Sequence, residues 1–172
     1  MTALPHNQSF WVVPDRFLAG NYPGNKTKAS ARKKLGPVLD SGVDVFIDLT
    51  EAGELEPYAH LLPEGVRHLR FPIRDVSVPN DISEMSAILD RIDAEIERQN
   101  LVYLHCWGGH GRTGTVVGCW LRRYGLGAED AIDQLQTLWQ QNVKSTWGGE
   151  YASTPQTTRQ SDYIRSWAEP PR

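Results

Sequence analysis

The stretch LVYLHCWGGHGRTGT, residues 101–115, decides the fold. Its first four residues are apolar or aromatic, which predicts a short buried strand. Glycines follow at positions 108, 109, 111 and 114, and glycine lets a backbone adopt positive φ and approach a ligand closely. An apolar run typical of a helix comes next. A strand, a glycine-rich loop and a helix N-terminus in this order predict a nest of inward-pointing amides that binds anions.

Three side chains of this loop are chemically reactive or charged. Cys106 stands at the base of the expected nest, where converging amides and the helix dipole would lower the pKa of its thiol toward neutrality. Arg112, six residues later, offers a planar fork for two phosphate oxygens. Thr113 places a hydroxyl beside the nucleophile. Together these residues predict a phosphate-binding loop with a nucleophile at its floor.

The rest of the chain alternates strand and helix patterns. Short apolar or β-branched runs predict strands at residues 17–20, 43–49, 67–73 and 101–104. Amphipathic spacing and helix-forming composition predict helices at residues 28–40, 82–96, 113–124, 128–140 and 155–167. The alternation favours an α/β fold, with a mostly parallel twisted sheet of four or five strands and helices on both faces. We expect residues 1–172 to form one such domain.

Composition excludes several classes of protein. Hydrophobic residues make up 40% of the chain and charged residues 23%, values ordinary for a globular protein. The net charge of −3 gives no general attraction to nucleic acid or to an anionic membrane. No apolar run approaches the roughly 18 residues of a membrane span, and the first ten residues lack the pattern of a signal peptide. We therefore expect a cytoplasmic protein, monomeric, with no nucleic-acid or membrane partner.

The cysteine loop resembles that of a known enzyme superfamily. His105, Cys106, Gly109, Arg112 and Thr113 match every fixed position of the signature HCxxGxxR[ST] of the protein tyrosine phosphatases. The match implies a phosphatase that acts through a covalent phosphocysteine.

Two further segments support the resemblance. Residues 71–79, FPIRDVSVP, resemble the general-acid loop of compact dual-specificity phosphatases, with Asp75 as the acid. Asp75 precedes the cysteine loop, whereas low-molecular-weight phosphatases place their acid after it. Residues 154–160, TPQTTRQ, are similar to an SPETxxQ stretch of small microbial members, although Thr154 replaces serine and Gln156 replaces glutamate.

The resemblance implies a role for each site residue. Cys106 would attack phosphorus while Asp75 protonates the leaving oxygen and later activates water. Thr113 would donate a hydrogen bond to the departing thiolate, Gln160 would orient the water, and His105 would position the loop through the backbone. Substrate phosphate would be bound by the loop, at Trp107, Gly108, Gly109, His110, Gly111 and Arg112. No metal and no cofactor are required, and the partner would be a phosphorylated protein or a small phosphomonoester.

The same loop has features of two other kinds of ligand site. Residues 109–114 satisfy GxGxxG, but a dinucleotide site needs a second strand after the helix, and residues 125–127 lead into another helix. A metal site could use His105, Cys106 and His110, which is one ligand short of the usual closed set. We expect the ring of His110 to point to solvent or substrate instead.

The identity of the acid has an alternative. Asp75 could be a turn residue or an ion-pair partner of Arg70 or Arg74, leaving Asp81 as the acid. Asp81, however, precedes a helix and has Glu84 three residues on, which is typical of an N-cap. A capping carboxylate is engaged by backbone amides, so the sequence favours Asp75.

Several other assignments stay open. Gln160 could be an ordinary helix residue, and Trp107 could either pack behind the loop or form one wall of the pocket. Cys119, on the helix after the loop, is expected to be a buried apolar residue. A phosphatase of a small metabolite and a phosphate-binding module without turnover are the alternative functions.

Overall fold

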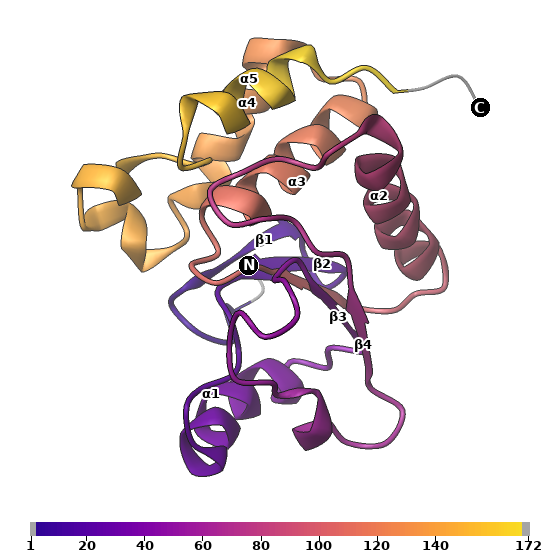
Figure 1. The fold of residues 1–172 in the computed structure, drawn as a ribbon, viewed down its shortest axis with the longest axis vertical. Helices are drawn as coiled ribbons and strands as arrows, with labels where there is room; N and C mark the ends of the chain where they lie inside the picture. The colour runs from indigo at the N-terminus through magenta and orange to yellow at the C-terminus, as the bar shows by residue number, and fades with distance from the viewer. Residues whose placement is uncertain (1–2, 170–172) are drawn as a thin grey trace.

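The structure is a computed structural model that describes residues 3–169, and its centre is one five-stranded sheet (Figure 1). The strands are β1 (Ser9–Val13), β2 (Phe17–Gly20), β3 (Val45–Asp48), β4 (Arg67–Arg70) and β5 (Val102–His105). Their order in the sheet is β1-β2-β5-β3-β4. Strands β2 to β5 run parallel, and only the edge strand β1 is antiparallel to its neighbour. The predicted mostly parallel sheet is confirmed.

Helices cover both faces of this sheet. The long helices are α1 (Lys28–Asp40), α2 (Ile82–Glu97), α3 (Gly111–Arg123), α4 (Ala128–Trp139) and α5 (Thr158–Ser166). Three short 3-10 helices are η1 (Ala59–Leu61), η2 (Val143–Thr146) and η3 (Gly149–Ala152). Helix α1 lies on one face, and α2 to α5 lie on the other (Figure 1).

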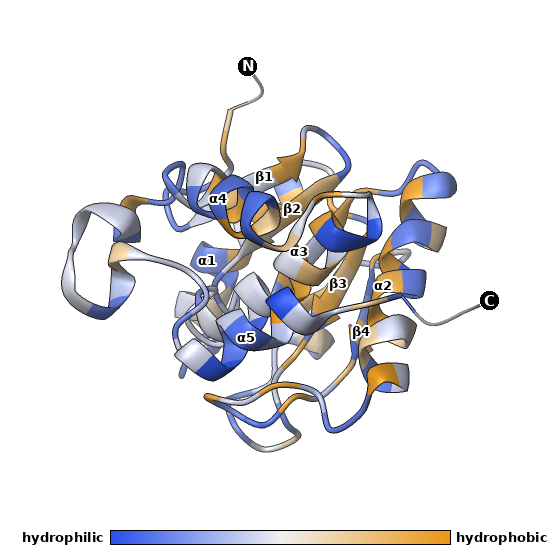
Figure 2. Ribbon diagram, turned by 90° about the horizontal axis from the view of Figure 1, so that it is seen from above, coloured by the Kyte–Doolittle hydropathy of each residue, from blue (hydrophilic) through white to orange (hydrophobic). Residues whose placement is uncertain are grey.

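Alternation along the strands gives each face its own core. In β3, Val45 and Ile47 pack toward α2 and α3, while Phe46 packs toward α1. Figure 2 shows hydrophobic strands enclosed by the helices. The helix of residues 82–96 is confirmed, because its apolar stripe (Met85, Ile88, Leu89, Ile92) is buried against the sheet.

The structure corrects several predicted boundaries. Strand β1 was not predicted from the sequence. Its five residues lie between loop segments and form only the edge strand of the sheet. Helix α5 begins at Thr158 rather than at 155, since Thr157 is its N-cap. Strand β4 ends at Arg70, and the chain to residue 81 is loop. After α3 the chain enters α4 and not a strand, which rules out the dinucleotide arrangement.

The parallel strands bring the functional loops together. The carboxyl ends of β3, β4 and β5 meet at one edge of the sheet, which is where ligands bind in open α/β sheets. Residues 49–58, 71–81 and 106–110 leave the sheet at this edge.

Within residues 3–169, no helix combines the length and the apolar character that crossing a membrane would demand.

Candidate active site

The cysteine loop is held tightly against the neighbouring strand. Cys106 follows β5 directly and is 3% exposed. Gly109 has a φ of 70°, and a Cβ atom there would lie 2.5 Å from the carbonyl of Gly20. The amide of Tyr22 also donates to the carbonyl of Trp107 at 2.8 Å. Only glycine at 109 therefore permits both the turn and the close contact with β2.

His105 holds the loop from behind. Its Nε2 lies 2.6 Å from the hydroxyl of Tyr58 and its Nδ1 lies 3.2 Å from the carbonyl of Cys106. Burial lowers the pKa of His105 to about 4, so the ring is neutral near pH 7. A neutral imidazole carries one N–H, and a carbonyl only accepts, so Nδ1 carries the proton and Nε2 accepts from Tyr58. His105 is thus hydrogen-bonded to the backbone of Cys106, and its role in orienting the loop stays a prediction.

Arg112 is fixed by the loops that follow β3 and β4. Its guanidinium is 1% exposed and donates to both carboxylate oxygens of Glu54, at 2.8 and 2.6 Å. The Nη1 atom also donates to the carbonyl of Ile73 at 3.0 Å. Burial opposes ionisation of Glu54, but the hydrogen bonds from Arg112 outweigh it and lower the pKa of that carboxyl. Burial opposes ionisation of Arg112, but the hydrogen bonds to Glu54, with Cys106 and Asp75 nearby, raise the pKa of its guanidinium above the usual range.

Glu54 is a site residue to which the sequence analysis gave no role. The glutamate is 58 positions from Arg112 in the chain, so no local spacing links them. Its bidentate contact keeps the guanidinium plane in one orientation.

Asp75 lies at the rim of the site. Its Oδ1 is 2.9 Å from Nη2 of Arg112, and its side chain is about half exposed. The ion-pair partner of Asp75 is thus Arg112 and not Arg70, which pairs with Asp48 at 3.0 Å. The residue after Asp75, Val76, has a φ of 55°, which is a strained value for a β-branched residue.

Asp81 has the capping role that its position predicted. Its side chain accepts from the amide of Glu84 at 3.0 Å and begins α2. It does not line the pocket beside the cysteine loop.

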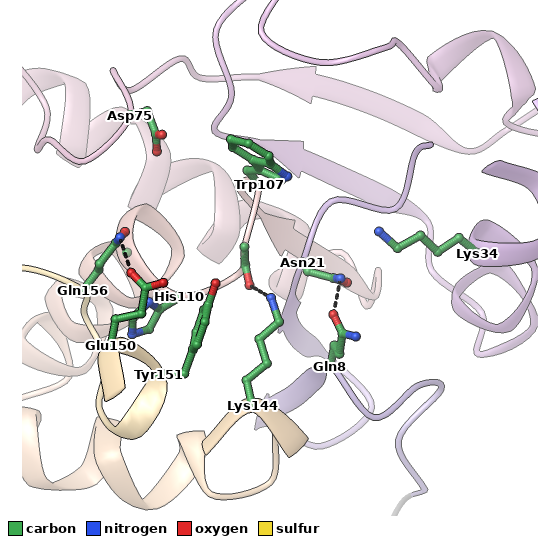
Figure 3. Close-up of a pocket in the computed structure, with 12 residues that line it drawn as sticks. Gln8, Asn21, Lys34, Asp75, Trp107, His110, Lys144, Glu150, Tyr151 and Gln156 are labelled. Atoms are coloured by element: carbon green, nitrogen blue, oxygen red, sulfur yellow. Dashed lines mark hydrogen bonds between the residues drawn. The ribbon is translucent and has the colours of Figure 1, made fainter. Parts of the chain in front are cut away.

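A pocket of about 430 Å³ opens beside the cysteine loop (Figure 3). Polar, charged and aromatic residues line it: Gln8, Asn21, Lys34, Asp75, Trp107, Gly108, His110, Gly111, Lys144, Glu150, Tyr151 and Gln156. Trp107 is 59% exposed and forms one wall, which settles the choice that the sequence left open.

His110 lines the pocket, but its ring does not point to solvent. The residue is 2% exposed, its ring stacks on Trp139, and its Nε2 is hydrogen-bonded to the carbonyl of Ser153. The ring is thus turned toward α4 and the segment after η3, away from solvent. The C-terminal half of the chain provides this apolar neighbour, which no loop motif reveals.

The structure also gives Gln160 different contacts from those expected. Its Oε1 accepts from the amide of Thr157 at 3.1 Å, and its Nε2 donates to the carbonyl of Ser77 at 3.0 Å. Both amide atoms are therefore engaged with backbone, linking α5 to the Asp75 loop. Gln156 is the glutamine that lines the pocket.

Thr113 is fully buried, and its hydroxyl makes no hydrogen bond within the described chain. Cys119 is buried as predicted, and burial raises the pKa of its thiol well above the usual range.

Among residues 3–169, no group of three or more histidine, cysteine or acidic side chains is arranged to bind a metal ion. The rings of His105 and His110 are directed to Tyr58 and to Ser153 instead.

Comparison with known proteins agrees with this geometry. The 067L protein of Invertebrate iridescent virus 3, named as a candidate tyrosine phosphatase, is 30% identical over 120 residues, covering 67% of this chain and 46% of that protein. This chain thus spans less than half the length of that relative, and 30% of the length of a second viral relative.

Solved structures share the fold. Tk-PTP in its active form superposes with a TM-score of 0.72 at 23% identity, covering 92% of this chain and 94% of that one. TpbA of P. aeruginosa, solved with phosphotyrosine, superposes with a TM-score of 0.67 at 18% identity, covering 96% of this chain and 88% of that one.

The family itself is identified by residues 6–163, which match the profile of the phosphatase domain of Swiss Army Knife proteins, described as a DSP-PTPase domain. This segment includes the complete cysteine loop, the Asp75 loop and Glu54. The chain belongs to this family of dual-specificity and protein tyrosine phosphatase domains.

Proposed function

We propose that this domain hydrolyses phosphomonoesters through a phosphocysteine formed on Cys106. One observation carries the proposal: Asp75 lies 2.9 Å from Arg112 and lines the same pocket as Trp107, Gly108 and Gly111 of the cysteine loop. The proposed acid therefore lies beside the loop that carries the proposed nucleophile and clamp. A nucleophile, an anion-binding loop and a proton donor are the groups that phosphoryl transfer to a protein side chain requires.

In the first step, the Cys106 thiolate attacks phosphorus and the bond to the leaving oxygen breaks. Asp75 gives its proton to that oxygen, which departs as an alcohol. The loop amides and Arg112 stabilise the charge on the equatorial phosphate oxygens, and this electrostatic term provides most of the rate. To act as acid, Asp75 exchanges its contact with Arg112 for one with the leaving oxygen.

In the second step, water attacks the phosphocysteine and Asp75 accepts a proton from the water. The sulfur–phosphorus bond breaks, and Cys106 leaves as a thiolate that accepts a hydrogen bond from the hydroxyl of Thr113. Inorganic phosphate is the product. The sequence predictions of a monomer in the cytoplasm, acting on a phosphorylated protein or a small phosphomonoester, remain part of this proposal.

Turnover of para-nitrophenyl phosphate tests the proposal directly. Release of para-nitrophenol that depends on enzyme concentration supports a phosphatase. Tight binding of inorganic phosphate without any release would instead indicate a phosphate-binding module.

Replacing Asp75 with asparagine (Asp75→Asn) is expected to lower kcat/KM strongly for substrates whose leaving group has a high pKa. The expected loss is about 100-fold for alkyl phosphates, because asparagine has no proton to give. The loss should be much smaller for para-nitrophenyl phosphate, whose leaving group needs little protonation. A plot of log kcat/KM against leaving-group pKa measures the difference in slope.

Asp81→Asn is the matched control for this prediction. Asparagine caps a helix as well as aspartate does, so activity should be unchanged and stability altered by about a few tenths of a kcal/mol at most. A leaving-group-dependent loss in Asp81→Asn, with none in Asp75→Asn, would mean that the acid has been misassigned.

Glu54→Gln is expected to lower kcat by roughly 10- to 100-fold, with a smaller change in KM. Glutamine keeps the size of the side chain but gives up one of the two charged contacts that orient Arg112. Steady-state kinetics with para-nitrophenyl phosphate measures both constants. Glu56→Gln, an exposed glutamate two residues on, is the control and should behave as wild type. Wild-type kcat in Glu54→Gln would show that Arg112 is aligned without it.

A further inference from the structure

Two lysines reach the pocket from separate parts of the chain. Lys34 comes from α1 and Lys144 from η2, and both extend toward the space in front of Asn21 and Trp107 (Figure 3). The Nζ atom of Lys144 donates to the carbonyl of Gly108 at 2.8 Å, and that of Lys34 donates to the carbonyl of Tyr22 at 2.5 Å. Each ammonium has three donors, so each retains donors for a ligand.

Neither ammonium is balanced by a carboxylate. In the described part of the chain, no acidic side chain lies within ion-pair distance of Lys34 or Lys144. Of the two carboxylates that line the pocket, Asp75 pairs with Arg112 and Glu150 lies 3.4 Å from Gln156. Lys144 is only 6% exposed, and its other neighbours are neutral: the ammonium lies 5.8 Å from the ring centroid of Trp147 and 5.4 Å from that of Tyr151.

The two charges also act on one another. Burial lowers the pKa of Lys144, and burial together with the charge of Lys144 lowers the pKa of Lys34. The hydrogen bond from Lys144 to the carbonyl of Gly108 places its ammonium beside the cysteine loop. A second anion bound between these lysines would relieve their repulsion and replace the solvation that burial removes.

The pocket continues past Lys34. A second cavity of about 340 Å³ shares Gln8, Asn21 and Lys34 with the pocket and runs along α1 to Ser30. The side chains of Gln8 and Asn21 are hydrogen-bonded to each other at 2.6 Å and line both cavities. The part of a substrate that is attached to the reacting phosphate could therefore extend into this second cavity, whose lining is polar and positively charged.

We propose that Lys34 and Lys144 form a second anion subsite, and that the substrate is a small phosphomonoester carrying a second phosphate. This inference rests on the proposed phosphatase function and specifies its substrate class. The cysteine loop, residues 105–115, contains no lysine, so selectivity for the second phosphate is provided by α1 and η2. The second phosphate belongs either to a free metabolite or to a lipid headgroup, which present the same chemistry to the two lysines.

The test is the ratio of kcat/KM for inositol 1,4-bisphosphate to that for inositol 4-phosphate, measured as phosphate release. The wild-type protein should favour the bisphosphate. Lys34→Met and Lys144→Met should each lower the ratio by about tenfold, since each removes a charge-assisted contact but keeps most of the apolar stem. Lys28→Met, which changes the same charge at an exposed position of α1, should leave the ratio unchanged.

Vesicles of phosphatidylcholine containing phosphatidylinositol 4-phosphate distinguish the two sources. Faster release from vesicles than from the soluble bisphosphate identifies a lipid headgroup, and the reverse identifies a free metabolite. A wild-type ratio of one or less, or a ratio that both lysine variants leave unchanged, overturns the subsite while turnover of the monophosphate still supports the phosphatase. Absence of Cys106-dependent turnover with every substrate, para-nitrophenyl phosphate included, overturns the proposed function itself.

Discussion

Cys106→Ser is expected to abolish phosphate release while phosphate binding persists. A serine hydroxyl is not ionised near pH 7, so the variant has no nucleophile that matches the thiolate. The glycine turn at Gly109 and the orientation of Arg112 do not depend on the sulfur, and the anion-binding loop should stay intact. Steady-state assays with para-nitrophenyl phosphate should show no turnover above background, and isothermal titration should show that inorganic phosphate still binds.

Cys119→Ala is the matched control for that variant. Cys119 is fully buried, and burial raises the pKa of its thiol, so it is neither accessible nor ionised. The variant should retain wild-type kcat, with a modest loss of thermal stability from the small cavity. Activity that survives in Cys106→Ser but is lost in Cys119→Ala would contradict the assignment of the nucleophile.

Arg112→Lys is expected to lower kcat by about a thousandfold or more, although the charge is conserved. The guanidinium contacts Glu54 through two nitrogens and still has a buried Nε without a hydrogen-bond partner in the described chain. A lysine ammonium is a single point charge and is unable to hold Glu54 and two phosphate oxygens at fixed angles. The values of kcat and KM for para-nitrophenyl phosphate, measured separately, give the effect on the transition state.

Arg159→Lys, at an exposed position of α5, is the control for the same chemical change and should leave both constants unaltered. An effect of Arg112→Lys confined to KM would show that Arg112 only attracts the substrate and does not act on the transition state.

Local sequence patterns predicted the parts of this protein that depend on neighbouring residues. The strand, the glycines and the helix of residues 101–115 follow from residue type and spacing alone, and the structure has them in that order. The N-cap role of Asp81 was predictable for the same reason, because a cap and its helix are adjacent in the chain. Alternating strands and helices were enough to predict a mostly parallel sheet.

The missed features depend on contacts between distant segments. Glu54 meets Arg112 only because β3 and β5 are neighbours in the sheet. Lys34 and Lys144 come from α1 and η2, and nothing in the spacing of two lysines over a hundred positions apart indicates a shared pocket. The ring of His110 points inward because it stacks on the ring of Trp139 in α4. Such side chains are placed by packing of the whole domain and not by a motif.

The central claim is that phosphate becomes covalently attached to Cys106 during turnover. The most direct measurement mixes Asp75→Asn with excess para-nitrophenyl phosphate, quenches in acid, and locates the phosphate by mass spectrometry of proteolytic peptides. Phosphorylation of this variant needs little acid catalysis, whereas hydrolysis lacks its base, so the intermediate should accumulate. The account predicts one phosphate on the peptide containing Cys106 and none in Cys106→Ser. Phosphate on Cys119, or turnover by Asp75→Asn without any covalent phosphate, would contradict it.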